Sequence, residues 1–134
     1  MLSRETVVHL GVAVLALAVF FIVPQVFDIQ DPTIGVVASV LFNALIFGGA
    51  HLVLAILGED RDDYPVAARW RTVGLVIALA VLALLAYALS TLTSLPDQLI
   101  RAVAMIVAVG VIAGYWYLEA RAGYRDSKTS QGTI

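Results

Sequence analysis

Four long apolar blocks, separated by short polar segments, make up most of the 134-residue chain. The polar segments lie around residues 28–31, 58–64 and 90–97, and each contains aspartate. An apolar block of about 18 residues or more is typical of a membrane-spanning helix. The pattern therefore predicts four spans, at about residues 6–27, 32–57, 65–89 and 95–122.

Each block has at least about 20 residues, which as a helix crosses about 30 Å of hydrocarbon. Backbone groups find no water partner in lipid, so the spans should be α-helices. Asp31 before Pro32 predicts a helix start, Gly58 a helix end, and Ser94–Leu95–Pro96–Asp97 a variant of the capping box. The short connections make neighbouring helices antiparallel.

These features predict an all-α fold, an integral membrane four-helix bundle with up-down-up-down topology. Residues 1–123 form one transmembrane domain, and the polar residues 124–134 are expected to be a disordered cytoplasmic tail. The first apolar block is longer than the core of a signal peptide and no cleavage site follows it, so we interpret it as a retained span.

Composition supports a lipid environment and excludes several functions. The chain is 61% hydrophobic and 13% charged, whereas a soluble domain is about half apolar and about a quarter charged. The net charge of -2, without a basic run, does not suit nucleic acid. The absence of cysteine excludes disulfides, thiol catalysis and thiolate metal sites.

Arginine and lysine predict the orientation, because they gather in cytoplasmic loops. Seven basic residues lie on the side of the two termini and the second loop, and only Arg101 lies on the other side. Both termini should therefore be cytoplasmic, in the plasma membrane. The seven are Arg4, Arg61, Arg69, Arg71, Arg121, Arg125 and Lys128.

Aromatic residues near the same side are interpreted as anchors at the membrane surface, where rings with a polar tip are enriched. They are Trp70, Tyr115, Trp116 and Tyr117.

The basic residues are seven arginines and one lysine, and the loops are rich in aspartate. This composition fits a prokaryote with a high-GC genome or an adaptation to salt.

Small and weakly polar residues form a stripe on the second span and a motif on the fourth. Gly35, Ser39 and Asn43 share one helix face, with Gly49 at its edge, and Gly110 and Gly114 are four residues apart. Such residues let helices approach closely, and Asn or Ser can hydrogen-bond across the contact. We expect these six residues to pack helices, within the chain or between chains. A polar lining for a pathway or a ligand pocket is the alternative for the second span.

Two histidines, His9 and His51, are the candidate cofactor ligands. They lie at similar predicted depths in the first and second spans, about 5 and 9 Å from the cytoplasmic ends. If the rings face each other, two imidazoles can ligate the iron of haem b, bind a quinone or relay protons. The alternative is that both are structural and bonded to neighbouring helices.

The middle of every span lacks Asp, Glu, Lys and Arg, which ion-coupled transport commonly requires. No phosphate-binding loop or catalytic triad is evident. The sequence therefore favours a non-enzymatic accessory or assembly subunit that packs against other membrane subunits or itself. A haem- or quinone-binding subunit of a redox complex, and a small homo-oligomeric transporter or channel, remain the alternatives.

Overall fold

The structure is a computed structural model, which describes residues 1–60 and 64–132. The described residues are almost entirely helical, and four helical stretches are long and apolar enough to cross a membrane. The second of these is built from three elements. The elements are α1 (Arg4–Val26), α2 (Pro32–Ala44), η1 (Leu45–Gly49), α3 (Ala50–Ile56), α4 (Val66–Leu92) and α5 (Asp97–Gln131).

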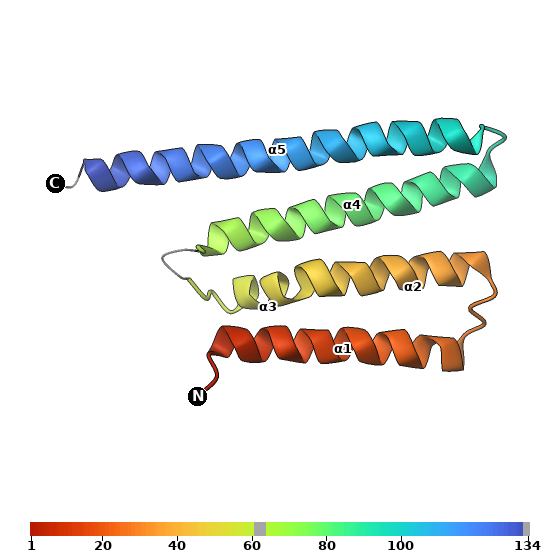
Figure 1. Cartoon of the computed structure of the whole chain (residues 1–134), viewed down its shortest axis with the longest axis horizontal. Coiled ribbons are helices and arrows are strands. Elements are labelled where there is room, and N and C mark those ends of the chain that lie inside the picture. The colour runs from red at the N-terminus through yellow and green to blue at the C-terminus, as the bar shows by residue number, and fades with distance from the viewer. Residues whose placement is uncertain (61–63, 133–134) are drawn as a thin grey trace.

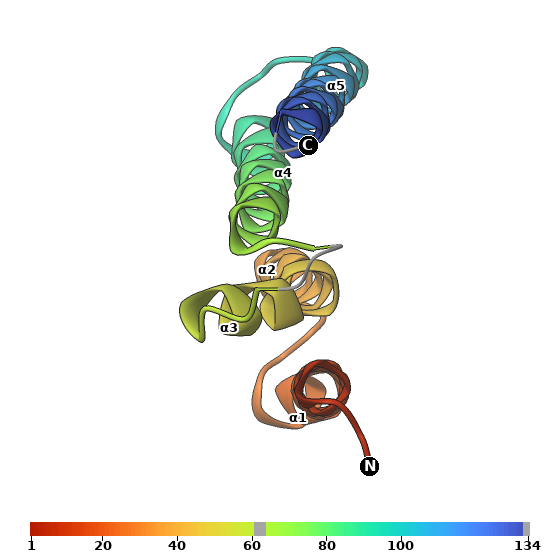
Figure 2. The ribbon, with the colours of Figure 1, turned by 90° about the vertical axis from the view of Figure 1, so that its left-hand side faces the viewer.

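The four stretches lie side by side in a row that is one helix thick (Figures 1 and 2). α1 packs against α2, η1 and α3, these elements pack against α4, and α4 packs against α5. Within the described ranges, α1 has no Cα within 8 Å of α4 or α5. The four long helices of the expected bundle are present, and they lie in a row without a common interior. Because the helices are apolar on all sides, the sequence pattern does not mark one face of each as the inner face.

Local signals account for most helix ends. The Asp31 carboxylate accepts a hydrogen bond from the Thr33 N–H and caps α2, as predicted. Gly58 ends α3 with φ of 66°, and the Gly58 and Glu59 N–H groups donate to Ala55 and Leu54, which is a Schellman motif. The predicted capping box is wrong, because α5 begins behind Pro96 without a side-chain cap.

Two helix ends differ from the sequence prediction. α4 continues to Leu92, because the Ser90 and Thr91 hydroxyls donate back to Tyr87 and Ala88 carbonyls and are satisfied within the helix. α5 continues to Gln131, where a disordered tail was expected. Extending an existing helix needs no new nucleus, so polar residues can continue it.

A π-helical turn, η1, interrupts the second long stretch, and two glycines in it lie at close contacts with neighbouring helices. A Cβ added to Gly48 would lie 3.0 Å from Val76 Cγ1 on α4. A Cβ added to Gly49 would lie 2.8 Å from Val12 Cγ1 on α1. The two glycines therefore let the middle of the row contact both neighbouring helices.

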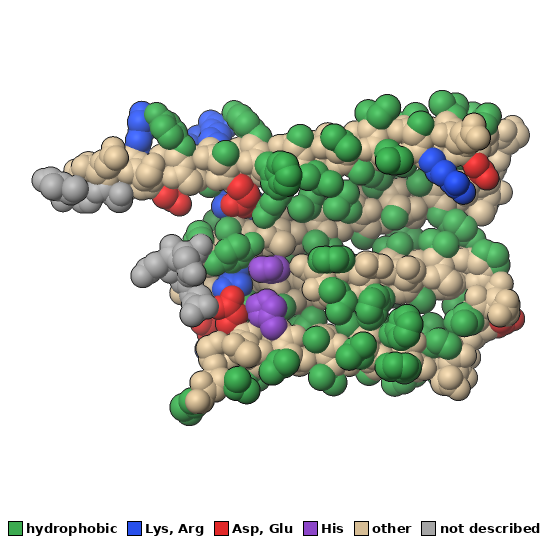
Figure 3. Space-filling model, viewed as in Figure 1, with side chains coloured by type: hydrophobic (Ala, Val, Ile, Leu, Met, Phe, Trp, Pro, Cys, Tyr) green, Lys and Arg blue, Asp and Glu red, His purple; other side chains and the backbone are tan. Residues whose placement is uncertain are grey.

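Few apolar side chains are buried, and large apolar side chains are exposed along every long helix (Figure 3). The small core is concentrated where α3 meets the start of α4. Among the described residues, the buried apolar ones are Ala16, Ala50, Leu54, Ala55, Ala68, Val73 and Ile100.

Candidate functional site

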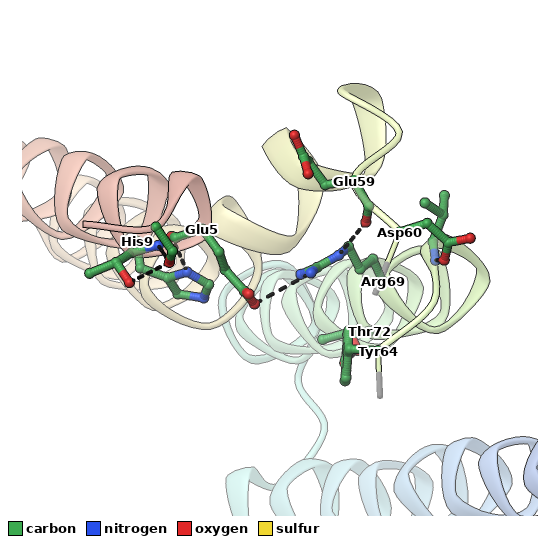
Figure 4. A network of polar contacts seen from close by, with 10 residues as sticks. Glu5, His9, Glu59, Asp60, Tyr64, Arg69 and Thr72 are labelled. Atoms are coloured by element: carbon green, nitrogen blue, oxygen red, sulfur yellow. Dashed lines mark hydrogen bonds and ion pairs between the residues drawn. The ribbon is translucent and has the colours of Figure 1, made fainter. Parts of the chain in front are cut away.

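Polar side chains gather at the end of the row that holds both chain termini (Figure 3). They come from α1, α3, the connection before α4, and α4 itself. We call this group the Arg69 cluster, and Figure 4 shows most of it. Its members are Glu5, His9, His51, Glu59, Tyr64, Arg69 and Thr72.

Arg69 is the centre of the cluster and is fully buried, with 0% of the residue exposed. Its Nη2 lies 3.3 Å from Glu5 Oε1 on α1, and its Nε donates to the Glu59 carbonyl at 3.2 Å. Its guanidinium carbon lies 5.1 Å from the centre of the Tyr64 ring. The Glu5–Arg69 pair links α1 to α4, two helices whose backbones do not touch (Figure 4).

Helix ends bring these groups together. Glu5 is in the first turn of α1, and Arg69 is in the first turn of α4, where its N–H donates to the Pro65 carbonyl at 3.3 Å. The Schellman motif at Gly58 turns the chain so that the Glu59 carbonyl meets Arg69. The Glu59 carboxylate in turn pairs with Arg4. The cluster thus joins three segments that are distant in sequence.

The two histidines do lie together. Their ring centres are 5.9 Å apart with an angle of 88° between the planes, and His9 Nδ1 donates to the Glu5 carbonyl at 2.8 Å. The other neighbour of His51 is Tyr64, at 5.3 Å between ring centres. Buried His51 Nδ1 and Arg69 Nη1 have no hydrogen-bond partner among the described residues.

Tyr64 connects the cluster to α5 through Thr72. The Thr72 hydroxyl donates to the Ala68 carbonyl at 3.1 Å, so the Tyr64 and Tyr115 hydroxyls, at 2.7 and 3.2 Å, both donate to Thr72. Burial raises the pKa of the Tyr64 phenol above its ordinary value of 10.0, which keeps it protonated as a donor.

A further ion pair fixes α5 to α4 at the same end of the row. Arg71 donates to both carboxylate oxygens of Glu119, at 2.7 and 3.3 Å. Such a two-point contact holds both side chains in one orientation. Polar contacts therefore link all four long helical stretches near the chain termini.

Of the six predicted packing residues, only Gly49 lies at a close helix–helix contact. Asn43 Nδ2 donates to the Ser39 carbonyl of its own helix at 2.8 Å, because an i−4 carbonyl is within reach of a short side chain. The nearest atom to a Cβ on Gly35 is the Ile29 carbonyl oxygen, at an ordinary 3.7 Å. A Cβ on Gly110 or Gly114 would meet nothing within 4 Å.

The predicted anchors separate into two groups. Trp70, Trp116 and Tyr117 are exposed, by 47%, 68% and 64% respectively. Tyr115 is instead partly buried against α4 through its bond to Thr72. Of the seven residues used for orientation, Arg61 lies outside the described residues.

A haem between His9 and His51 does not fit this packing. A macrocycle there would have to extend between α1 and α3. Only two to three residues from the histidines, Val12 of α1 packs against Gly49 of η1, where an added Cβ would lie 2.8 Å from Val12 Cγ1. The far side of His51 is covered by Tyr64. Haem ligation would therefore require α1 to separate from the row.

The sequence prediction counted Arg69 only as a charge that sets orientation and did not identify Glu5 or Tyr64. A signal was present, because Glu5 is the only acidic residue before residue 28 and Arg69 follows Pro65 by one helical turn. Within residues 1–60 and 64–132, no group of three or more histidine or acidic side chains is arranged to hold a metal ion. The geometry of the Arg69 cluster is that of a structural contact that holds α1 and α4 together.

No protein-family model, curated protein or solved structure matches the chain. The site is therefore interpreted from its own geometry.

Proposed function

We propose that this chain is a multi-pass membrane protein with four spans and both termini in the cytoplasm. Four helical stretches of sufficient length and hydropathy support this, as do the large apolar side chains exposed along them. Exposed apolar surface on this scale is unfavourable in water and neutral in lipid. Among the described residues, Arg101 is the only basic one at the end of the row opposite the Arg69 cluster, which supports the orientation.

Within the membrane, we infer that the chain is a non-enzymatic subunit that associates through the outer face of α5. The observation that carries this inference is the open glycine pair Gly110 and Gly114. Both are exposed, and an added Cβ at either would meet nothing within 4 Å. α5 is the edge helix of the row and, among the elements that the structure describes, it contacts only α4.

The glycine pair is separate from the face of α5 that packs within the chain. That inner face repeats every three or four residues through Ile100, Ala104 and Ala108. At about 100° per residue, the glycines lie roughly a third of a turn away from it. Glycines four residues apart on an open helix face favour close packing with a second helix. The partner is a second copy of this chain or another membrane subunit.

The arrangement of the helices in a row limits the alternative function, that of a transporter or channel. A layer one helix thick encloses no interior of its own, so a pathway would have to form between several copies. Oligomer formation is thus the property that both functions share, and it is tested first.

Association is tested by in-membrane cross-linking and by measuring the mass of the purified protein in detergent. We expect Gly110→Leu with Gly114→Leu to remove the oligomer or the co-purified partner and to leave the helical content unchanged. Gly11→Leu is the matched control, because Gly11 is an open glycine on the opposite edge helix. A wild-type chain that is monomeric and partner-free in native membranes would contradict the proposal.

Topology is tested with single cysteines, since the chain has none of its own. Ser3→Cys should react with a membrane-impermeant thiol reagent only from the cytoplasmic side, and Ser94→Cys only from the other. Labelling of both from one side would overturn the four-span arrangement.

A further inference from the structure

A groove between α2 and α4 has the features of a binding site. Its volume is about 560 Å³, within the usual range for small-molecule sites. It follows α4 from Thr72 to Ala83, which is about 17 Å at 1.5 Å per residue. The only polar side chains among its lining residues are Ser39, Asn43 and Thr72.

Asn43 is the lining residue with the most hydrogen-bonding capacity left, and the Ser39 hydroxyl lies one helical turn from it on the same groove. A carboxamide has two N–H donors and an oxygen acceptor, and Asn43 uses one N–H on the Ser39 carbonyl. Thr72, by contrast, already donates to Ala68 and accepts from two tyrosines. An amide with unused hydrogen-bonding groups is costly in hydrocarbon, so a partner at Asn43 is favourable.

The depth of Asn43 limits what that partner can be. Asn43 lies near the middle of the apolar stretch Pro32–Ile56. Phospholipid headgroups stay at the membrane surface, about 15 Å from the middle. A ligand that reaches Asn43 must therefore carry a polar group that is stable inside the hydrocarbon.

Charge limits the ligand further. No ionisable side chain lines the groove, so a charged ligand would have no counter-ion there. The lining is otherwise aliphatic and aromatic, with Phe47 on the π-helical turn and Ala80 on α4. π-helical turns are frequent at functional sites. The ligand is thus neutral and mostly apolar, with at least one hydrogen-bonding oxygen.

We propose that this groove binds a neutral isoprenoid quinone, with a ring oxygen at Asn43 and the isoprenoid chain along α4. The carboxamide donates to the carbonyl of the oxidised quinone and accepts from the hydroxyl of the reduced form, so it suits both. The proposal concerns binding alone. It rests on the membrane insertion proposed above and is independent of association through α5.

The test uses the full chain in detergent micelles and counts bound ligand by native mass spectrometry. The probes are decylubiquinone and decylbenzene, which share the decyl chain; only the first has ring carbonyl oxygens, and it also carries two methoxy groups and a methyl group. We expect the wild type to bind one decylubiquinone, and decylbenzene about three- to tenfold more weakly, as one hydrogen bond implies. Asn43→Leu should remove this preference and leave the chain folded.

Ala80→Phe should fill the groove and weaken binding of both probes. Ala102→Phe is its matched control, because Ala102 is exposed on α5 away from the groove. The glycine variant of α5 should bind quinone like the wild type, which keeps this test distinct from that of association.

Three results would overturn the proposal. Equal binding of the two probes by the wild type would mean that the groove holds any alkyl chain. Unchanged quinone binding by Asn43→Leu and Ala80→Phe would place the ligand elsewhere. Loss of self-association in Asn43→Leu would assign Asn43 to a contact between copies of the chain.

Discussion

The two ends of the helix row are held together in different ways. At the end opposite the termini, residues 27–31 and 93–96 connect neighbouring helices directly, and one side-chain hydrogen bond, Thr33 to Tyr87 at 2.9 Å, joins α2 to α4. At the termini end, where α1 begins and α5 ends, neither helix is connected to its neighbour by a loop. There the Arg69 cluster and the Arg71–Glu119 pair provide the links.

The difference indicates that polar side-chain contacts hold neighbouring helices together at the end of the row where no loop connects them. A short connection keeps two helices adjacent at little entropic cost. No loop joins the start of α1 to a neighbouring helix, and the Glu5–Arg69 pair keeps this end of α1 near α4. If this comparison is right, removing polar groups at the termini end should cost more than removing them at the opposite end.

The largest effect is expected for Arg69→Met. Removing one partner of a buried ion pair costs about 3–5 kcal/mol, and we expect the lower end because the Glu5 side chain is 26% exposed. The measurement is the free energy of unfolding in mixed micelles. Arg101→Met, at the opposite end, is the control and should change stability by less than about 0.5 kcal/mol.

A double-mutant cycle sharpens this prediction. Glu5→Gln combined with Arg69→Met leaves no unpaired charge, so the double variant should be less destabilised than the sum of the single variants. Additive effects would show that Arg69 acts by packing alone and would remove the ion pair from the comparison.

The next effect is at the glycine contacts of the middle stretch. Gly49→Ala should destabilise the fold by about 1–3 kcal/mol, because its Cβ would lie 2.8 Å from Val12 Cγ1. Val12→Ala should relieve this cost when the two are combined. Gly114→Ala, with open space around its Cβ, should be neutral or stabilising in the monomer. Equal effects at Gly49 and Gly114 would contradict the close contact.

Much of the fold follows from the sequence because hydropathy determines it. Four apolar blocks predict four helices, and every predicted end except that of α5 lies within a few residues of the observed one. Asp31 and Gly58 act as the local rules for helix ends require. The arrangement of the helices does not follow in the same way. Apolar residues surround each helix, so the pattern does not distinguish a row from a closed bundle.

The candidate site was only partly predictable for a related reason. The matched depths of His9 and His51 predicted that they could meet, and their rings are 5.9 Å apart. Arg69 was missed because its burial depends on three segments, α1, α3 and the connection before α4, that converge only in the fold. Charge counting along a chain cannot separate a buried arginine from an exposed one.

A smaller effect compares the same chemical deletion at both ends of the row. Tyr115→Phe removes a partly buried hydrogen bond to Thr72 and should cost about 1 kcal/mol. Tyr87→Phe removes the exposed bond to Thr33 and should cost less, about 0.5 kcal/mol. Both are measured as free energies of unfolding. A larger loss of unfolding free energy for Tyr87→Phe than for Tyr115→Phe would mean that polar contacts stabilise the opposite end more strongly.

The smallest effect concerns Tyr64 and alkaline pH. Burial raises the pKa of its phenol above 10.0, so the protonated ring contributes stability that is fully present below pH 10 and is lost as the pH rises through the folded-state pKa. Above pH 10, the wild type should therefore lose stability more steeply than Tyr64→Phe. The measurement is the unfolding free energy against pH, with tyrosinate absorbance recorded alongside it. Parallel curves for the two proteins would show that Tyr64 ionises as freely in the fold as in the unfolded chain, and would remove it from the links that hold the termini end together.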